Sequence, residues 1–280
     1  MKPQTIQIFL PTGDPNGIRI AEITSRTIQV LCIPRKILQE ALKRPECNNV
    51  GLYLLFGLDE ETGKEKLYIG EAEDCAIRLK SHQKNKDYWT HALVCISKTQ
   101  FFTKAHVKFL EHHAHTQASK ASRYILENGN IPTKSHISES VEADLLDNFE
   151  TINTLCAALG YKPFNSLSEK KNRNIYFCKG KSANAKGDFT SEGFIVLKGS
   201  LINADTTKSY HKYLIDKRDQ LLDQGSLEKK GDALQLTEDL QFNSPSTAAL
   251  VLGRNSNGWI EWKNKEGKTL DEVERQNSDK

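Results

Sequence analysis

Two apolar segments, VGLYLLFGL at residues 50–58 and KLYIG at residues 66–70, decide how the middle of this chain folds. Both are rich in the aliphatic and aromatic residues that strands favour. Between them, EETGK at residues 60–64 has the composition of a hairpin turn. The pattern predicts two adjacent antiparallel strands, and a matching register would point Tyr53 and Tyr68 to one face of the sheet.

Helix and strand patterns follow this hairpin and complete a compact unit. Asp74 is a suitable N-cap for a helix, and residues 89–97 are apolar enough for a third strand. Thr103 can cap a second helix that extends to about residue 119. The order strand, strand, helix, strand, helix predicts an α+β fold with a three-stranded antiparallel sheet flanked by helices.

Five side chains of this unit carry chemistry. Tyr53 and Tyr68 come from the hairpin. Arg78 and His82 lie four residues apart and share one face of the first helix, and Glu111 lies on the second helix. Phosphodiester hydrolysis needs groups that align and deprotonate a water and groups that stabilise charge on the phosphate. A lone carboxylate can hold one Mg²⁺ that keeps most of its waters, and such an ion is a Lewis acid toward a phosphate.

In their order and spacing, Gly51-Leu52-Tyr53, Tyr68-Ile69-Gly70, Arg78 and Glu111 resemble the signature of the GIY-YIG nuclease family. The resemblance covers about the middle third of the chain. It implies an endonuclease that hydrolyses DNA phosphodiester bonds, with DNA as its partner and a single Mg²⁺ (or Mn²⁺) ion as its cofactor. The first motif has a Leu at its middle position and the loop at residues 57–66 is somewhat long, but neither departure removes a reacting group.

The resemblance also implies a role for each residue. Tyr53 would help to deprotonate the attacking water, and Tyr68 would orient the water or the phosphate. Arg78 would grip the scissile phosphate, a task suited to a permanently charged fork. His82 would assist proton transfer, and Glu111 would bind the metal ion.

Further polar residues of this region leave alternatives open. Relatives carry an Asn downstream of the Glu, and here Asn128 and Asn130 compete for that place, with Asn128 favoured. His112, His113 and His115 follow Glu111, but no Cys or carboxylate set completes a tetrahedral metal site. We expect these histidines on a wet helix surface.

A basic rim is the last feature of the middle region. Lys84, Lys86 and Lys98 lie close in sequence to Tyr88 and Trp89. Lysines supply affinity for phosphates and aromatic rings stack on bases, so these residues fit a surface that faces DNA. Tyr88 and Trp89 fit the protein core equally well.

The patterns along the whole chain predict four parts. Residues 1–48 form a small N-terminal β-ribbon and a short helix. Residues 49–160 form the nuclease-like domain, which ends with an amphipathic helix at residues 138–159. Residues 161–173, rich in Lys, Ser and Asn, are typical of a linker. Residues 174–280 form a second small α+β module.

The sequence of the C-terminal module predicts several short strands and helices. We expect strands at residues 175–178 and 194–197, helices at 209–222 and 246–253, a loop at 223–232, and a hairpin at 259–262. The segment from Ser246 to Leu270 resembles an uncharacterised module that follows GIY-YIG domains in bacterial proteins, and the N-terminal ribbon fits the same subgroup. The hairpin more faintly resembles a module proposed to sense modified DNA in restriction systems. For Trp259 and Trp262 we favour a place in the core of a small β-unit.

Net charge, cysteine spacing and the length of apolar runs limit which classes of protein fit this sequence. The 280 residues carry a formal net charge of +3, too small to indicate nucleic acid by itself. None of the six cysteines forms a C-x-x-C pair, so we expect buried, reduced thiols. No apolar run approaches membrane-spanning length, which favours a cytoplasmic protein without a membrane partner. Two other functions fit: a non-catalytic DNA-binding or modified-DNA-sensing protein, and a subunit of a restriction or defence complex.

Overall fold

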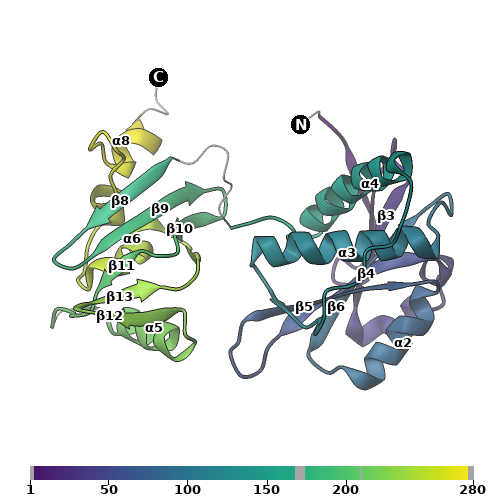
Figure 1. The fold of residues 1–280 in the computed structure, drawn as a ribbon, viewed down its shortest axis with the longest axis horizontal. Coiled ribbons are helices and arrows are strands. Elements are labelled where there is room, and N and C mark those ends of the chain that lie inside the picture. Colours follow the sequence, from purple (N-terminus) through teal and green to yellow (C-terminus); the bar gives the residue numbers. More distant parts are fainter. Residues whose placement is uncertain (1–2, 168–173, 209, 277–280) are drawn as a thin grey trace. The chain divides into compact units, whose positions relative to one another are not determined.

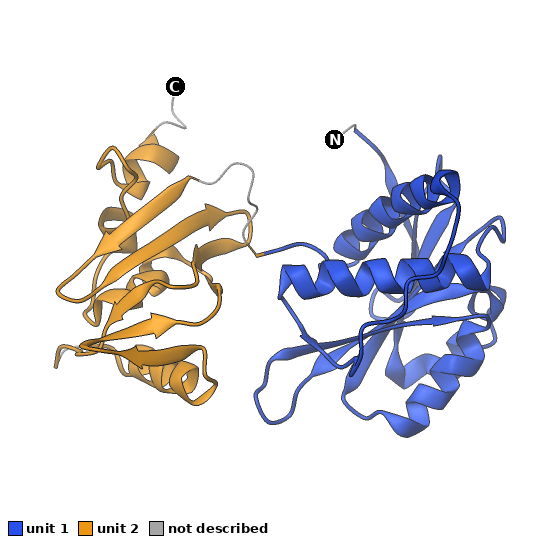
Figure 2. Cartoon of the chain, viewed as in Figure 1, with its two compact units in different colours: residues 1–166 blue, residues 167–280 orange. Residues whose placement is uncertain are grey.

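The computed structural model describes residues 3–167, 174–208 and 210–276. The chain forms two compact units, residues 1–166 and residues 167–280 (Figure 2). Of the linker expected at residues 161–173, the last six residues lie outside the described part. Tyr161 and Phe164 pack against the core of the first unit, so the beginning of this segment is structured.

The described residues of the first unit form one seven-stranded sheet in the order β1-β2-β3-β6-β4-β5-β7. Figure 1 labels its strands β3, β4, β5 and β6. All neighbours are antiparallel except β5 and β7. The strands are β1 Ile6–Phe9, β2 Arg19–Ile23, β3 Ile28–Pro34, β4 Gly51–Leu58, β5 Glu65–Ala72, β6 Trp89–Ser97 and β7 Ile125–Leu126.

The predicted three-stranded sheet was therefore too small. Strands β4, β5 and β6 occupy the expected residues, but β3 pairs with β6 along its whole length and joins the N-terminal ribbon to the same sheet. The reason lies in β3, where Ile28, Val30, Leu31, Cys32 and Ile33 are all buried. A strand that is apolar on both faces must lie inside a sheet with both faces covered.

Helices cover both faces of this sheet. Asp74 caps α2 by accepting a hydrogen bond from Ile77 N at 3.0 Å, and Thr103 caps α3, so both predicted caps are confirmed. The helices of the unit are η1 Arg35–Ile37, α1 Leu38–Ala41, η2 Pro45–Asn48, α2 Cys75–Asn85, α3 Lys104–Ala121 and α4 Glu139–Ala158.

Alternate residues of β4 serve two separate cores. Leu52 and Leu54 pack with residues of α3 and α4. Tyr53 and Leu55 face the other way and pack with residues of α2. The sheet thus lies between α2 on one face and α3 with α4 on the other, and any site that uses both α2 and α3 must form at an edge of the sheet.

The second unit is also α+β. Its described strands form one sheet in the order β12-β13-β11-β9-β10-β14, with β8 paired to β9. These strands are β8 Ile175–Lys179, β9 Asn184–Thr190, β10 Gly193–Val196, β11 Leu201–Asn203, β12 Leu227–Lys230, β13 Ala233–Leu236 and β14 Leu240–Phe242. The helices are α5 Lys212–Asp223, α6 Pro245–Ala248, η3 Ala249–Leu252, α7 Gly258–Glu261 and α8 Leu270–Glu274.

Two predictions for this unit were wrong. The hairpin expected at residues 259–262 is the short helix α7, which begins where the side chain of Asn257 accepts a hydrogen bond from Trp259 N at 3.1 Å. The loop expected at 223–232 contains β12, whose polar side chains conceal its pairing with β13. Trp262 is fully buried in the core, as expected. Residue 209, where a helix was expected to start, lies outside the described residues.

All six cysteines are free and buried, as predicted. Among the described residues, no helix combines the length and the apolar character needed to cross a lipid bilayer.

Candidate active site at one edge of the first sheet

The register of β4 and β5 brings the two tyrosines of the signature to one face. Tyr53 lies opposite Gly70, and Leu55 lies opposite Tyr68. Tyr53 and Tyr68 are therefore diagonal neighbours, and their rings stack with centroids 6.1 Å apart. This confirms that both phenols point to the same side of the sheet.

Both glycines of the two motifs are required by packing. A Cβ atom on Gly70 would lie 2.3 Å from Oη of Tyr53 and 2.9 Å from Cε1 of Tyr68. A Cβ atom on Gly51 would lie 2.8 Å from the carbonyl oxygen of Cys95. Gly70 thus creates the space in which Tyr53 lies, and Gly51 allows β4 to approach β6.

The hydroxyl of Tyr53 joins two residues of α2. Oη of Tyr53 lies 2.8 Å from Nε2 of His82, and Nε of Arg78 donates a hydrogen bond to the same oxygen at 3.2 Å. Arg78 and His82 are one helical turn apart, so both reach the phenol from one side of α2. Tyr53 is fully buried and His82 is 5% exposed, whereas Arg78 is exposed.

Burial fixes the protonation states in this cluster. Burial raises the pKa of Tyr53, so the phenol keeps its proton at neutral pH. Burial, together with the charges of Arg78 and Lys86, lowers the pKa of His82 to about 4. The hydrogen bond to Tyr53 raises the pKa of Arg78 further above its ordinary value. The cluster therefore holds a neutral phenol, a neutral imidazole and a guanidinium cation.

Glu111 comes from α3, on the other side of the sheet, and lies near the part of β5 that extends beyond its pairing with β7. It lines a pocket of about 380 Å³ together with Tyr68 and Asn128. The other lining residues are Lys108, Gly129, Asn130, Pro132 and Thr133. The structure thus brings Glu111 to the same pocket as Tyr68, but among the described residues no hydrogen bond or ion pair joins it directly to Tyr53, Arg78 or His82.

The electrostatics of Glu111 differ from those of a surface carboxylate. Burial and then the charge of Glu71 raise the pKa of Glu111 to about 7. Lys104, whose Nζ lies 2.8 Å from the Glu71 carboxylate, acts in the opposite direction. A half-buried carboxylate beside a second one is stabilised in its charged form by a cation.

Glu111 is the carboxylate that lines this pocket, and it could hold a single hydrated Mg²⁺ ion. No group of three or more His, Cys, Asp or Glu side chains suited to a metal occurs among the described residues. One carboxylate is nevertheless enough for Mg²⁺, which usually keeps several waters. Glu111, with its raised pKa and its acidic neighbour Glu71, is the residue that would hold the ion.

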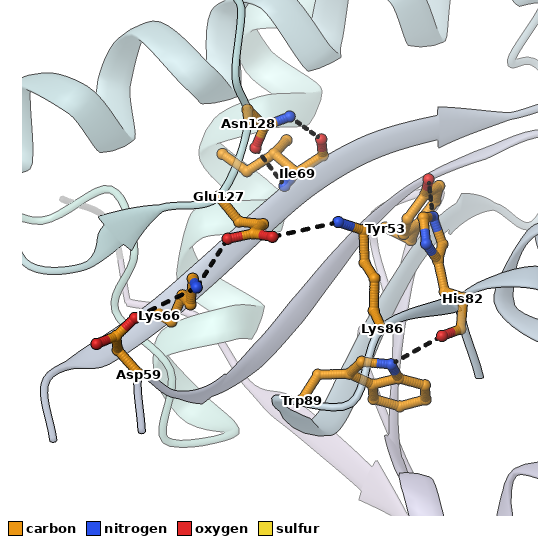
Figure 3. Close-up of polar contacts among 9 residues, drawn as sticks. All are labelled: Tyr53, Asp59, Lys66, Ile69, His82, Lys86, Trp89, Glu127 and Asn128. Atoms are coloured by element: carbon orange, nitrogen blue, oxygen red, sulfur yellow. Dashed lines mark hydrogen bonds and ion pairs between the residues drawn. The ribbon is translucent and has the colours of Figure 1, made fainter. Parts of the chain in front are cut away.

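Asn128 lies directly beyond β7 and continues its pairing with β5. Its Nδ2 donates to the carbonyl oxygen of Ile69 at 2.7 Å, and the amide nitrogen of Ile69 donates to its Oδ1 at 3.0 Å (Figure 3). The side-chain amide therefore replaces a peptide group along the strand edge. Asn130 is exposed and also lines the pocket.

The three histidines after Glu111 pack into the protein, so the expected wet surface was wrong. His115 is 6% exposed, and the ring of His113 meets that of Phe149 with centroids 4.6 Å apart. Nδ1 of His112 lies 2.7 Å from the carbonyl oxygen of Pro132. Phe149 belongs to α4, which packs beside α3, so this helix covers His113.

A charged network beside Tyr68 was not predicted from the sequence. Nζ of Lys86 lies 4.6 Å from the centre of the Tyr68 ring and 3.5 Å from the carboxylate of Glu127. Glu127 also pairs with Lys66 at 2.9 Å (Figure 3). The network depends on the parallel pairing of β5 with β7, for which the two-residue strand β7 gives no sequence signal.

The other residues of the expected basic rim differ in their burial and in their partners. Trp89 is 1% exposed and belongs to the core, where its indole nitrogen donates to the carbonyl oxygen of His82 at 3.5 Å. Lys98 pairs with Glu22 at 3.3 Å. Tyr88 is half-buried and Lys84 is exposed.

Comparison with known protein families gives a match within the second unit. Residues 176–274 match the family model described as "Domain of unknown function (DUF4357)". No curated protein matches the chain, and no solved structure matches it.

Proposed function

We propose that the first unit is a Mg²⁺-dependent endonuclease of the GIY-YIG type that hydrolyses phosphodiester bonds of DNA. One observation carries the proposal. The buried phenol of Tyr53 is hydrogen-bonded to His82 and Arg78, directly beside a pocket that Tyr68 and Glu111 share. A phenol, an imidazole, a guanidinium and a carboxylate at one sheet edge supply the groups that phosphodiester hydrolysis requires.

Arg78 is the phosphate ligand in this proposal. Its Nε is held by Tyr53, which leaves the terminal nitrogens of an exposed guanidinium for an anion. A guanidinium positioned in advance by a buried phenol stabilises developing negative charge without further reorganisation.

The two phenols take different positions. Tyr68 lines the pocket, so it is the phenol that contacts the attacking water or the phosphate. Tyr53 is fully buried behind it and holds Arg78 and His82 in place. Oη of Tyr53 accepts from Arg78 and also shares a hydrogen bond with Nε2 of the neutral His82, whose tautomer decides which of the two atoms donates. The family resemblance assigns His82 to proton transfer, and with a pKa of about 4 it would carry a proton only transiently at neutral pH.

Glu111 is the residue that would hold Mg²⁺. The ion supplies Lewis-acid stabilisation of charge on the phosphate when it is bound. Lys86 and Lys108 add positive charge near Tyr68 and Glu111 respectively, which favours the approach of a polyanion.

The test is a cleavage panel with the full chain and Mg²⁺ on supercoiled plasmid, duplex, flap, junction and methylated DNA. Variants Arg78→Ala and Glu111→Ala are compared with Lys98→Ala, which alters a lysine paired to Glu22 outside the pocket. The proposal expects cleavage by the wild type and Lys98→Ala and none by the other two. Binding without cleavage on every substrate would favour the alternative, a non-catalytic DNA-binding protein.

A further inference from the structure

The second unit contains a pocket of about 580 Å³ that is separate from the candidate active site. Its volume lies within the range of about 300–1,000 Å³ that is usual for ligand sites. It is lined by Phe177, Lys179, Glu261, Lys263, Asn264, Lys265 and Gly267. A smaller pocket of about 240 Å³ adjoins it and shares Asn264 and Lys265.

An aromatic ring that the core does not use forms one wall. Along β8, Tyr176 and Cys178 are fully buried in the core, and Phe177 points to the opposite face. Phe177 stacks on no other ring in the part of the chain that the structure describes. Its cross-strand neighbour is Lys186, which is exposed. A half-buried ring in a polar pocket is a surface on which a planar ligand can stack.

The charge around this ring is positive. Lys179, Lys263 and Lys265 are exposed, and no ion pair between described residues neutralises them. Glu261 is the acidic residue of the lining, and its carboxylate is already paired with Arg254 at 2.8 Å. The pocket therefore favours an anion, and its lysines are free to contact phosphates.

The segment after α7 forms another wall of the pocket, and hydrogen bonds hold its backbone in place. Phe177 and Lys263 exchange backbone hydrogen bonds of 2.7 and 2.9 Å, which attach the segment after α7 to the edge of β8. The following turn is closed by Asn264, whose Oδ1 accepts from the amides of Glu266 and Lys268, both at 3.0 Å. The backbones of Phe177 and Lys263 are thus held beside each other before a ligand binds.

We propose that this pocket binds an unpaired nucleotide, with its base stacked on Phe177 and its phosphates contacted by Lys179, Lys263 and Lys265. A ring beside several free lysines matches the two chemical parts of a nucleotide. A duplex hides its base faces, so a nucleic acid ligand would be single-stranded at this point. The proposal concerns the second unit and does not require the first to be a nuclease.

Binding of a fluorescein-labelled strand of thymidines to the full chain, measured by anisotropy in EDTA, tests this without cleavage. We expect Phe177→Ala to weaken binding by about 5- to 150-fold, and Phe177→Tyr to restore most of it. Lys263→Ala/Lys265→Ala should weaken binding and reduce the slope of log K against log salt by about 1.4. The matched control is Lys212→Ala/Lys229→Ala, which removes the same charge from exposed positions outside the pocket.

A second readout locates the strand. A thymidine strand that carries 5-iododeoxyuridine should crosslink under ultraviolet light to the peptide that contains Phe177. Unlabelled thymidine monophosphate and a duplex of equal length serve as competitors. Competition by the monophosphate identifies a free nucleotide as ligand, and competition by longer single strands alone identifies a nucleic acid. Pocket variants that bind like the control, a crosslink outside the second unit, or equal competition by the duplex would overturn the proposal.

Discussion

Oη of Tyr53 lies 2.8 Å from Nε2 of His82 beneath the pocket that Tyr68 lines, and Nε of Arg78 reaches the same oxygen at 3.2 Å. One buried hydroxyl thus fixes two residues of α2 against β4. The arrangement separates the phenol that holds the cluster together from the phenol that is open to a ligand. Each tyrosine therefore has its own expected phenotype.

Replacement of Tyr53 by Phe should lower stability and activity together. It leaves a buried His82 without its phenol partner, which costs about 1–3 kcal/mol in the free energy of unfolding. It also frees Arg78, and misplacement of this proposed phosphate ligand should lower DNA cleavage about 10²-fold. Tyr68→Phe should leave stability within about 0.5 kcal/mol while cleavage falls. Urea denaturation and plasmid nicking of both variants check this, and equal stability losses would contradict it.

The motif glycines give a purely steric prediction. Gly70→Ala and Gly51→Ala each place a Cβ atom within 3 Å of neighbouring atoms. Overpacking of this kind should cost about 1–3 kcal/mol. The control is Gly129→Ala, because a Cβ atom there meets nothing within 4 Å. The midpoint of thermal unfolding is measured for the three variants. A Gly70→Ala protein as stable as Gly129→Ala would contradict this prediction.

Replacement of Asn128 should lower the stability of the protein, whereas replacement of Asn130 should not. Asn128→Ala removes two hydrogen bonds to Ile69 and leaves the edge of β5 uncovered, which should cost about 1–3 kcal/mol. It should also lower cleavage, because Tyr68 precedes Ile69 on the same strand. Asn130→Ala, at an exposed position, should keep stability within about 0.5 kcal/mol. Denaturant unfolding compares the two, and a larger loss for Asn130→Ala would reverse the assignment.

The pH dependence of cleavage should report Glu111. With its pKa raised to about 7, the carboxyl is protonated below that pH and cannot bind Mg²⁺. The cleavage rate should therefore rise with pH through about 7 at limiting Mg²⁺. Higher Mg²⁺ should move the midpoint to lower pH, since the ion competes with the proton. Lys104→Ala should move it to higher pH, because Lys104 lowers the pKa of Glu111. A midpoint independent of Mg²⁺ would exclude this role.

The central strands, the helix caps and the shared face of Tyr53 and Tyr68 could be predicted because each follows from a local pattern. The apolar run at β4 and the capping residues Asp74 and Thr103 act over a few residues. The register that places Tyr53 opposite Gly70 follows from the hairpin that joins the strands.

Non-local pairings could not be predicted in the same way. The pairing of β3 with β6 enlarged the sheet, and the burial of His113 depends on Phe149, which comes from α4. The Lys86–Glu127 pair next to Tyr68 needs the parallel contact of β5 with β7. In the second unit, α7 replaced a hairpin because the Asn257 side chain caps a helical turn.

The central claim is that Arg78 on one side of the β5 edge and Glu111 on the other act on one phosphate. The most direct measurement is the single-turnover cleavage rate of a labelled DNA at saturating Mg²⁺ for the wild type, Arg78→Ala, Glu111→Ala and the double variant. The account predicts that each single variant loses about 10²-fold or more. It further predicts that the double variant loses little beyond the worse single one, because the two residues act as a unit. Losses that multiply fully in the double variant, or a wild-type chain that cleaves no DNA, would contradict it.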